Sequence, residues 1–86
     1  MQVAYKPRFI RQLKGLEPRL REEAIEKIEL FKDKKNHAAL RVHTLHGPLK
    51  GFFSFSVNFK YRIVFYYESK NEAVLLSIGD HKIYDN

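Results

Sequence analysis

The chain has 86 residues, of which 44% are hydrophobic, 14% aromatic and 30% charged, and it carries a formal net charge of +6. This length holds one domain with one modest core, and the composition excludes a disordered chain. No apolar stretch approaches the roughly 20 residues that span a bilayer, and the lack of cysteine excludes disulfides, zinc–thiolate sites and a thiol nucleophile. We therefore expect a single domain over residues 1–86 that works in the cytoplasm.

The positive charge is concentrated in the first part of the chain. Residues 1–62 hold 14 Lys and Arg against 6 Asp and Glu, whereas residues 63–86 hold 2 against 4. A basic excess of this size favours a nucleic acid or an acidic protein as the partner, because binding to phosphates releases counterions. The alternative is that the charge serves only solubility.

The first half of the chain predicts a short strand and two helices. Residues 2–5 alternate weakly, as an edge strand does. Pro7 suits the first turn of a helix that ends near Gly15, with its apolar residues at helical spacing: Phe9, Ile10, Leu13 and Leu16. A longer helix opens at Glu17-Pro18, ends in a group of lysines, and carries one apolar stripe: Leu20, Ala24, Ile28 and Phe31.

The second half predicts strands. Residues 40–45 alternate until a turn at His46-Gly47-Pro48, and residues 53–59 alternate between apolar and small polar side chains. Asn58-Phe59-Lys60 forms a hairpin connection, and residues 61–67 and 73–78 form the last two strands of a meander. The predicted fold is α+β, with an N-terminal helical hairpin packed on one face of a small, mainly antiparallel, twisted sheet. Function is then expected on the other face.

The chain shows no motif for a metal or a nucleotide cofactor. Its glycines form no phosphate loop, and its histidines, at positions 37, 43, 46 and 81, lack metal-ligand spacing. We therefore expect no cofactor and no metal.

A set of cations and imidazoles remains near the predicted sheet. His43 lies in the first of these strands, Arg62 interrupts an apolar strand, and His81 and Tyr84 follow the last strand. Such a set suits RNA cleavage by the 2′-hydroxyl, because histidine exchanges protons near neutral pH and arginine binds two phosphate oxygens. Further residues that could bind RNA are Arg41, His46, Lys50, Lys60 and Lys82.

Each of these residues also has an ordinary structural explanation. Arg62 could form a surface ion pair, His43 could be a polar-face strand residue, and His81 could simply be solvated. Three aromatic residues could stack on bases or pack in a core or a partner interface: Phe52, Phe59 and Tyr66. Spacing alone leaves these alternatives open.

The sequence resembles the RelE/ParE superfamily of bacterial toxin–antitoxin toxins over nearly its whole length. The resemblance is carried by four short motifs in order, which are Leu45-His46-Gly47, Lys50-Gly51, Tyr61-Arg62-Ile63-Val64-Phe65 and Ile78-Gly79-Asp80-His81. It implies a small sheet with two N-terminal helices on one face. It also implies one of two activities, which are metal-independent mRNA cleavage on the ribosome and inhibition of DNA gyrase. Either would be held inactive by an antitoxin.

The resemblance also implies roles for individual residues. Arg62 matches the phosphate-stabilising arginine, His81 matches a catalytic His or Arg, and His43 matches a histidine of the YafQ-like members. Tyr84 matches a C-terminal catalytic or stacking tyrosine. His81 would then be the general acid and His43 the general base.

The chain departs from the family pattern on its middle strand. Ser54 and Ser56 stand where some members place lysines or a histidine, and Lys60 stands where others have an acidic residue. The histidine set favours the RelE- and YafQ-like mRNA endoribonucleases, with a cognate antitoxin and ribosome-bound mRNA as partners. The alternatives are a gyrase inhibitor and a non-toxic relative that only binds antitoxin.

Overall fold

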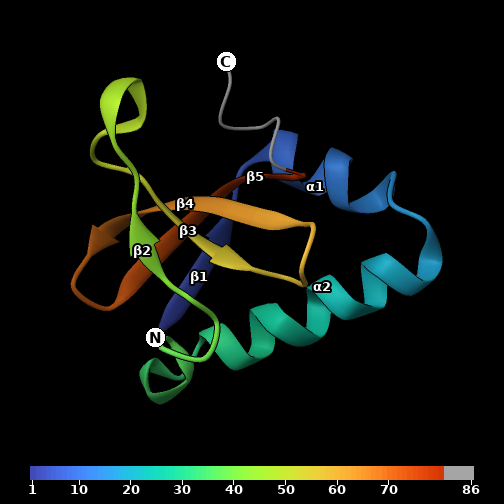
Figure 1. The fold of residues 1–86 in the computed structure, drawn as a ribbon, viewed down its shortest axis with the longest axis horizontal. Helices are drawn as coiled ribbons and strands as arrows, with labels where there is room; N and C mark the ends of the chain where they lie inside the picture. The colour runs from blue at the N-terminus through green and yellow to red at the C-terminus, as the bar shows by residue number, and fades with distance from the viewer. Residues whose placement is uncertain (81–86) are drawn as a thin grey trace.

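The computed structural model describes residues 1–80 and has the predicted α+β composition (Figure 1). Its elements are β1 (Gln2–Tyr5), α1 (Pro7–Lys14), α2 (Pro18–Phe31), the 3-10 helix η1 (Lys34–Asn36), β2 (His43–Thr44), the 3-10 helix η2 (Gly47–Leu49), β3 (Phe53–Ser56), β4 (Arg62–Ser69) and β5 (Glu72–Gly79). Within the described residues, neither α-helix has the length and apolar character needed to cross a membrane.

The five strands form one sheet in the order β1-β5-β4-β3-β2. Neighbouring strands from β5 to β2 are antiparallel, which confirms the predicted meander. β1 pairs in parallel with β5 at the edge, as expected for the weakly alternating residues 2–5. Between β4 and β5 a bulge at Leu76 leaves Val64 paired with Ser77 and Phe65 paired with Leu75.

The core is built from both helices and from alternate residues of the strands. Phe31 at the end of α2 stacks on Phe55 with ring centroids 4.3 Å apart, and it meets the edge of Phe65 at 4.8 Å. All three rings are fully buried. The same cluster includes further residues of α1, α2 and the strands: Phe9, Ala24, Ile28, Ile63, Ala73, Leu75 and Ile78. Aromatic packing of this kind holds the helices to the sheet.

Local sequence sets where the two helices begin and end. Proline occupies the first turn of each, where a missing N–H costs no hydrogen bond. The Glu17 carboxylate accepts hydrogen bonds from the backbone N–H groups of Arg19 and Leu20, and so caps α2. Arg21 then donates from Nη2 to the carbonyl of Leu16 at 3.0 Å, which ties α2 to the link that follows α1.

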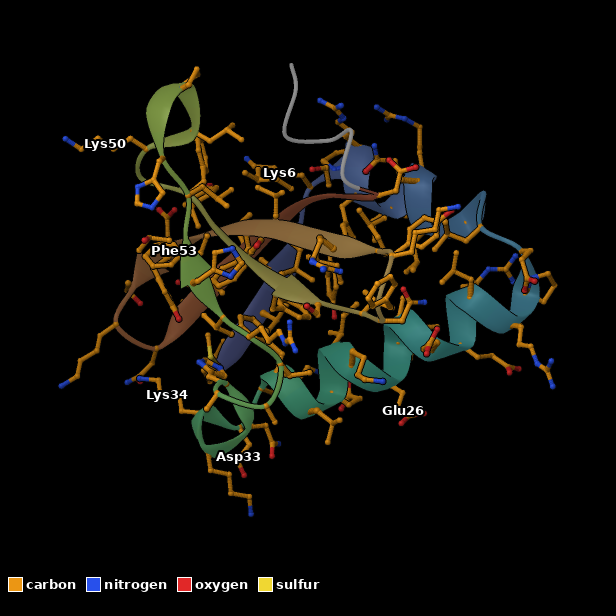
Figure 2. The ribbon with its side chains drawn as sticks, in the orientation of Figure 1. Lys6, Glu26, Asp33, Lys34, Lys50 and Phe53 are labelled. Carbon is orange, nitrogen blue, oxygen red and sulfur yellow. The ribbon has the colours of Figure 1, made fainter. Side chains whose placement is uncertain are left out.

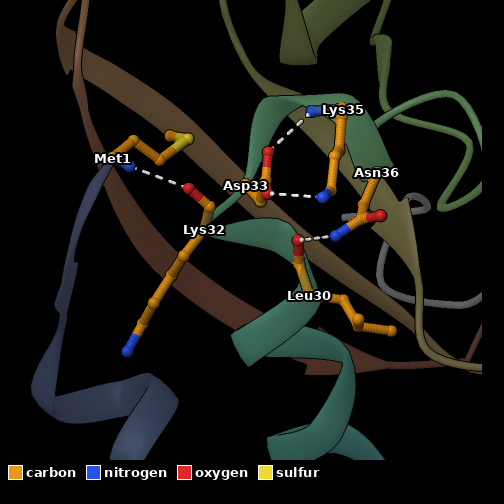
Figure 3. Close-up of polar contacts among 6 residues, drawn as sticks. All are labelled: Met1, Leu30, Lys32, Asp33, Lys35 and Asn36. Atoms are coloured by element: carbon orange, nitrogen blue, oxygen red, sulfur yellow. Dashed lines mark hydrogen bonds and ion pairs between the residues drawn. The ribbon is translucent and has the colours of Figure 1, made fainter.

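The lysine-rich segment after α2 is held in place by polar contacts of its own (Figure 3). The N-terminal ammonium of Met1 donates to the carbonyl of Lys32 at 2.8 Å, and Asn36 donates from its side chain to a carbonyl in the last turn of α2 at 2.9 Å. Asp33 accepts from the backbone N–H of Lys35 at 3.1 Å, and this bond lowers the pKa of the Asp33 carboxyl. These contacts give the segment a structural role.

The prediction of a strand over residues 40–45 is wrong for residues 40–42. Only His43 and Thr44 pair with β3, and residues 38–41 form a turn that places Leu40 in the core. The turn closes through hydrogen bonds from the backbone N–H of Arg41 to Ala38 and from Val42 to His37, so these groups are not available to a strand. The strand predicted over residues 53–59 likewise ends at Ser56, because the chain turns at Asn58.

Candidate functional site on the sheet face opposite the core

Small and charged side chains line the part of the sheet that does not enter the core. Side chains alternate along a strand, so Ser54 and Ser56 lie opposite to Phe55, which is in the core. Ser54 pairs with Val64 and Ser56 pairs with Arg62 across β3 and β4. We call the surface formed by these four residues the opposite face. Ser54 and Val64 are buried, whereas Ser56 and Arg62 are partly exposed, so the accessible part of the opposite face lies at the Ser56–Arg62 pair.

His43 lies at the edge of the opposite face with a defined tautomer. Its Nδ1 lies 2.8 Å from the carbonyl oxygen of Arg41, and because a carbonyl can only accept, Nδ1 carries a proton. In the neutral ring, Nε2 then keeps its lone pair. Nε2 lies 3.4 Å from the hydroxyl of Ser54, its partner in the β2–β3 register, and Ser54 is fully buried. His43 as a whole is exposed, and with Nδ1 protonated Nε2 is the ring nitrogen that can accept a proton.

Arg41 combines a charged side chain with unusual backbone geometry. Its φ of 59° places it in the left-handed region, which costs a non-glycine residue about 1 kcal/mol. The preceding carbonyl, of Leu40, accepts from the backbone N–H of Ser56 at 2.8 Å. This contact brings Arg41 beside the end of β3, and its own carbonyl orients His43. Strained residues of this kind concentrate at functional sites.

Arg62 is the first residue of β4, and its guanidinium is fixed by the turn before it. Its Nη1 donates to the carbonyl of Asn58 at 2.8 Å and also contacts the carbonyls of Phe59 and Tyr61 at 3.2 and 3.1 Å. Among the hydrogen bonds within residues 1–80, none uses Nη2 or Nε of this side chain. Arg62 and Arg41 line one hollow of about 250 Å³ together with Ala39, Ser56, Asn58 and Phe59. Two cations thus meet in one small concave site.

The other predicted RNA-binding residues lie on both sides of this hollow. Lys60 is in the turn between β3 and β4, beside Arg62, and its Nζ lies 5.9 Å from the centroid of the Tyr61 ring. His46 precedes η2 and Lys50 follows it, in the loop at the other end of β3. Lys50 projects outward from this loop (Figure 2). The structure therefore does not bring His46 and Lys50 beside Arg62.

A larger groove runs between the start of α1 and the η2 loop, and sequence analysis did not identify it. Its volume is about 560 Å³, and its lining has a basic side formed by Lys6, Arg8 and Arg11 and an apolar part that includes Leu49, Phe52, Val64 and Leu76. The spacing of Arg8 and Arg11 by three residues on a helix is a sequence signal for such a basic side. That the groove also reaches Val64 follows only from the tertiary structure.

Three predicted site residues, His81, Lys82 and Tyr84, lie outside the described residues. The last strand ends at Gly79, which pairs with Arg62 across β4 and β5. The chain therefore leaves the sheet next to Arg62. Within residues 1–80, no three His, Asp or Glu side chains are grouped so that they could hold a metal ion.

No family model and no curated protein matches the sequence. Solved structures do match its fold. The RelBE2 toxin–antitoxin complex from Mycobacterium tuberculosis is 22% identical with a TM-score of 0.69, covering 93% of this chain and 96% of the other. The YoeB–YefM complex from Staphylococcus aureus is 15% identical with a TM-score of 0.72, covering 94% and 97%. A mutant of YafQ from Escherichia coli is 15% identical with a TM-score of 0.72, covering 99% and 98%. The resemblance inferred from the sequence is thereby confirmed at the level of the fold.

Proposed function

We propose that this chain, which has the RelE/ParE-like toxin fold, is a ribosome-dependent mRNA endoribonuclease toxin. The observation that carries the proposal is the meeting of Arg62 and Arg41 in one hollow, on the same side of the sheet as His43 in a proton-accepting tautomer. In this proposal the helical hairpin covers the core face of the sheet and leaves the partly exposed Ser56–Arg62 end of the opposite face to RNA. The protein would act in the cytoplasm, where its mRNA substrate is translated.

The chemistry that fits these groups is cleavage by the 2′-hydroxyl of the RNA itself. His43 takes the proton of that hydroxyl through Nε2, and the 2′-oxygen forms a bond to the adjacent phosphorus. The bond from phosphorus to the 5′-oxygen breaks, and His81 gives a proton to the leaving oxygen. The products are a 2′,3′-cyclic phosphate and a 5′-hydroxyl. Proton transfer by two histidines of this kind typically contributes 10²- to 10⁴-fold for each transfer.

Arg62 would stabilise the negative charge that develops on the phosphorane. The carbonyls that hold Nη1 orient the guanidinium before RNA binds, so little reorganisation is needed at the moment of reaction. His43 pairs with Ser54, Ser54 pairs with Val64, and Arg62 lies two residues from Val64 along β4. Two strand spacings and this step along β4 place the Cα atoms of His43 and Arg62 about 12 Å apart. Both residues lie on the same face by their register, and in this proposal one phosphodiester binds between their side chains.

The remaining cations would bind the RNA backbone. Lys60 lies on the Arg62 side of the site, whereas His46 and Lys50 lie at the other end of β3 and would contact a neighbouring stretch of the strand. Lys82 would bind a phosphate, and Tyr84 would stack or assist proton transfer. Contacts to phosphates position an RNA without reading its sequence.

We also propose a cognate antitoxin as partner. The M. tuberculosis and S. aureus structures are toxin–antitoxin complexes. The groove beside α1 joins basic and apolar residues, and no carboxylate of the described part of the chain lines it. An acidic, partly disordered segment with apolar residues would complement such a groove.

Mapping the 5′ ends of cellular mRNA after induction tests the proposed activity. We expect growth arrest and new 5′-hydroxyl ends within translated regions for the native chain. Arg62→Ala and His81→Ala should each abolish both effects. Arg19→Ala removes the same charge from an exposed position on α2 and should leave both unchanged.

Two results would contradict this function. Arrest with DNA-damage signalling and intact mRNA would assign the chain to gyrase inhibition. Expression of the folded chain without any arrest would assign it to the non-toxic, antitoxin-binding class.

A further inference from the structure

The turn between β3 and β4 presents one aromatic ring that packs against almost nothing. The side chain of Phe59 is 95% exposed, whereas the other exposed large hydrophobic residues within residues 1–80, Tyr5, Ile25 and Leu30, are 40–46% exposed. Single exposed hydrophobic residues are common on protein surfaces. The surroundings of Phe59 therefore matter more than its exposure.

The backbone that carries Phe59 is held firmly although the ring is not. The Asn58 carboxamide oxygen accepts from the backbone N–H groups of Lys60 and Tyr61 at 2.9 and 2.8 Å. The Asn58 amide nitrogen donates to the carboxylate of Glu23 on α2 at 2.7 Å, which anchors the turn to the helix. The ring is thus presented from a fixed backbone, and a ligand that contacts it need not order the turn.

The same turn holds the guanidinium of Arg62. Nη1 of Arg62 contacts the carbonyl of Phe59 itself as well as that of Asn58. Phe59, Arg62 and Arg41 all line the hollow of about 250 Å³, and among residues 1–80 no Asp or Glu takes part in its lining. An exposed aromatic ring and two cations in one hollow match the two parts of a nucleotide, which are a flat base and a phosphate.

We propose that Phe59 stacks on a base of the RNA whose phosphate is bound by Arg62 and Arg41. The inference rests on the proposed RNA-cleaving function and adds a positioning residue to it. Because every base offers a π-face, the stack would hold a nucleotide without selecting its identity. Phe59 would fix the strand relative to Arg62 and take no part in proton transfer.

The absence of tryptophan from the sequence allows a direct optical test. Phe59→Trp places the only indole of the chain at the turn, and Ile25→Trp places it on the exposed side of α2 as a matched control. A fluorescently labelled single-stranded RNA with 2′-O-methyl groups throughout cannot be cleaved, so its binding can be followed by anisotropy. Both variants should bind it. Tryptophan emission should be quenched in Phe59→Trp and unchanged in Ile25→Trp.

Kinetics on ribosomes with a defined mRNA provide the second readout. Phe59→Leu keeps an apolar side chain but removes the π-face, and we expect it to raise KM about 10- to 100-fold, as for the loss of one base–aromatic stack. The value of kcat should change by less than about threefold. Phe59→Tyr and Phe59→Trp should restore KM to within about threefold of the native value.

The outcomes separate this inference from the function on which it rests. RNA binding without quenching, together with a native KM for Phe59→Leu, would overturn the stacking role while leaving RNA cleavage in place. Loss of antitoxin binding in that variant would then assign the ring to a protein contact. A native chain that neither binds nor cleaves RNA would instead overturn the proposed function, and the stacking role with it.

Discussion

The two faces of the sheet use neighbouring residues of the same strands for different purposes. On the core face, Phe55 and Phe65 are fully buried and pack against the Phe31 ring of α2. On the opposite face, Ser56 and Arg62 form a cross-strand pair whose side chains remain partly exposed. Because side chains alternate, a step of one residue along β3 or β4 moves from the residues that stabilise the fold to those proposed to bind RNA.

The difference between the faces has a consequence for mutation. Core positions are fixed by packing, so truncation there should destabilise the fold and reduce every activity together. The partly exposed opposite-face residues Ser56 and Arg62 contribute little buried apolar area, so substitutions there should change activity at nearly constant stability. The following experiments test whether stability and activity divide between the two faces in this way.

Phe31→Ala should have the largest effect, on the core face. The ring contacts both Phe55 and Phe65, and truncating a buried phenylalanine costs about 3–5 kcal/mol in the free energy of unfolding. Much of the stability of a small domain would be lost, since such domains unfold at a cost of about 5–15 kcal/mol. Urea denaturation followed by circular dichroism measures the change. A loss below about 1 kcal/mol would show that the aromatic cluster does not hold the helices to the sheet.

Arg62→Lys should have the next largest effect, on the opposite face. Lysine keeps the charge but lacks the planar fork that binds two phosphate oxygens. We expect mRNA cleavage to fall about 100-fold, which corresponds to roughly 2.7 kcal/mol of transition-state stabilisation. The free energy of unfolding should change by less than about 1 kcal/mol.

Cleavage rates on programmed ribosomes and urea denaturation give the two values for Arg62→Lys. The matched control is Arg19→Lys on α2. A native cleavage rate in folded Arg62→Lys would show that the guanidinium of this opposite-face residue is not needed for activity.

Substitution of Tyr67 should have the smallest effect, which is a change in how the free energy of unfolding depends on pH. Burial raises the pKa of its phenol above the ordinary value of 10.0. A raised pKa in the folded state means that this contribution to stability is complete below about pH 10 and is lost as the pH rises through the folded-state pKa. Tyr67→Phe removes the titration, so its free energy of unfolding should fall less than that of the native chain between pH 9 and pH 11.

The expected difference for Tyr67 is below about 1 kcal/mol, because the side chain is only partly buried and solvent screens the charge. Urea denaturation of both proteins at each pH measures it. Identical curves would place the phenol in an aqueous environment in the folded state.

Helical and alternating periodicity sufficed to predict most of the fold. Both helices, the edge strand and the meander follow from the spacing of apolar residues and from the prolines and turn residues between them. The prediction of a strand over residues 40–45 failed because alternation does not reveal the left-handed conformation of Arg41 or the hydrogen bonds of its turn. Phe59 continues the alternation of β3, yet it is exposed because the chain turns at Asn58.

The candidate site was predicted less completely than the fold. Arg62 stood out in the sequence as a cation within an apolar strand, and His43 as an imidazole in a predicted strand. The shared hollow of Arg41 and Arg62 depends on the contact of Leu40 with Ser56, which no sequence period encodes. The groove beside α1 also joins residues far apart in the sequence. Roles proposed for His81, Lys82 and Tyr84 stay predictions from the sequence.

The most direct test of RNA cleavage on the opposite face uses purified protein, ribosomes and one defined mRNA. We expect the chain to produce a 2′,3′-cyclic phosphate and a 5′-hydroxyl, and a 2′-deoxy nucleotide at the cleaved position to block the reaction. Arg62→Ala should be inactive under the same conditions, and Arg19→Ala should match the native rate. An intact mRNA with the native chain, or equal cleavage of the 2′-deoxy substrate, would contradict the proposed chemistry.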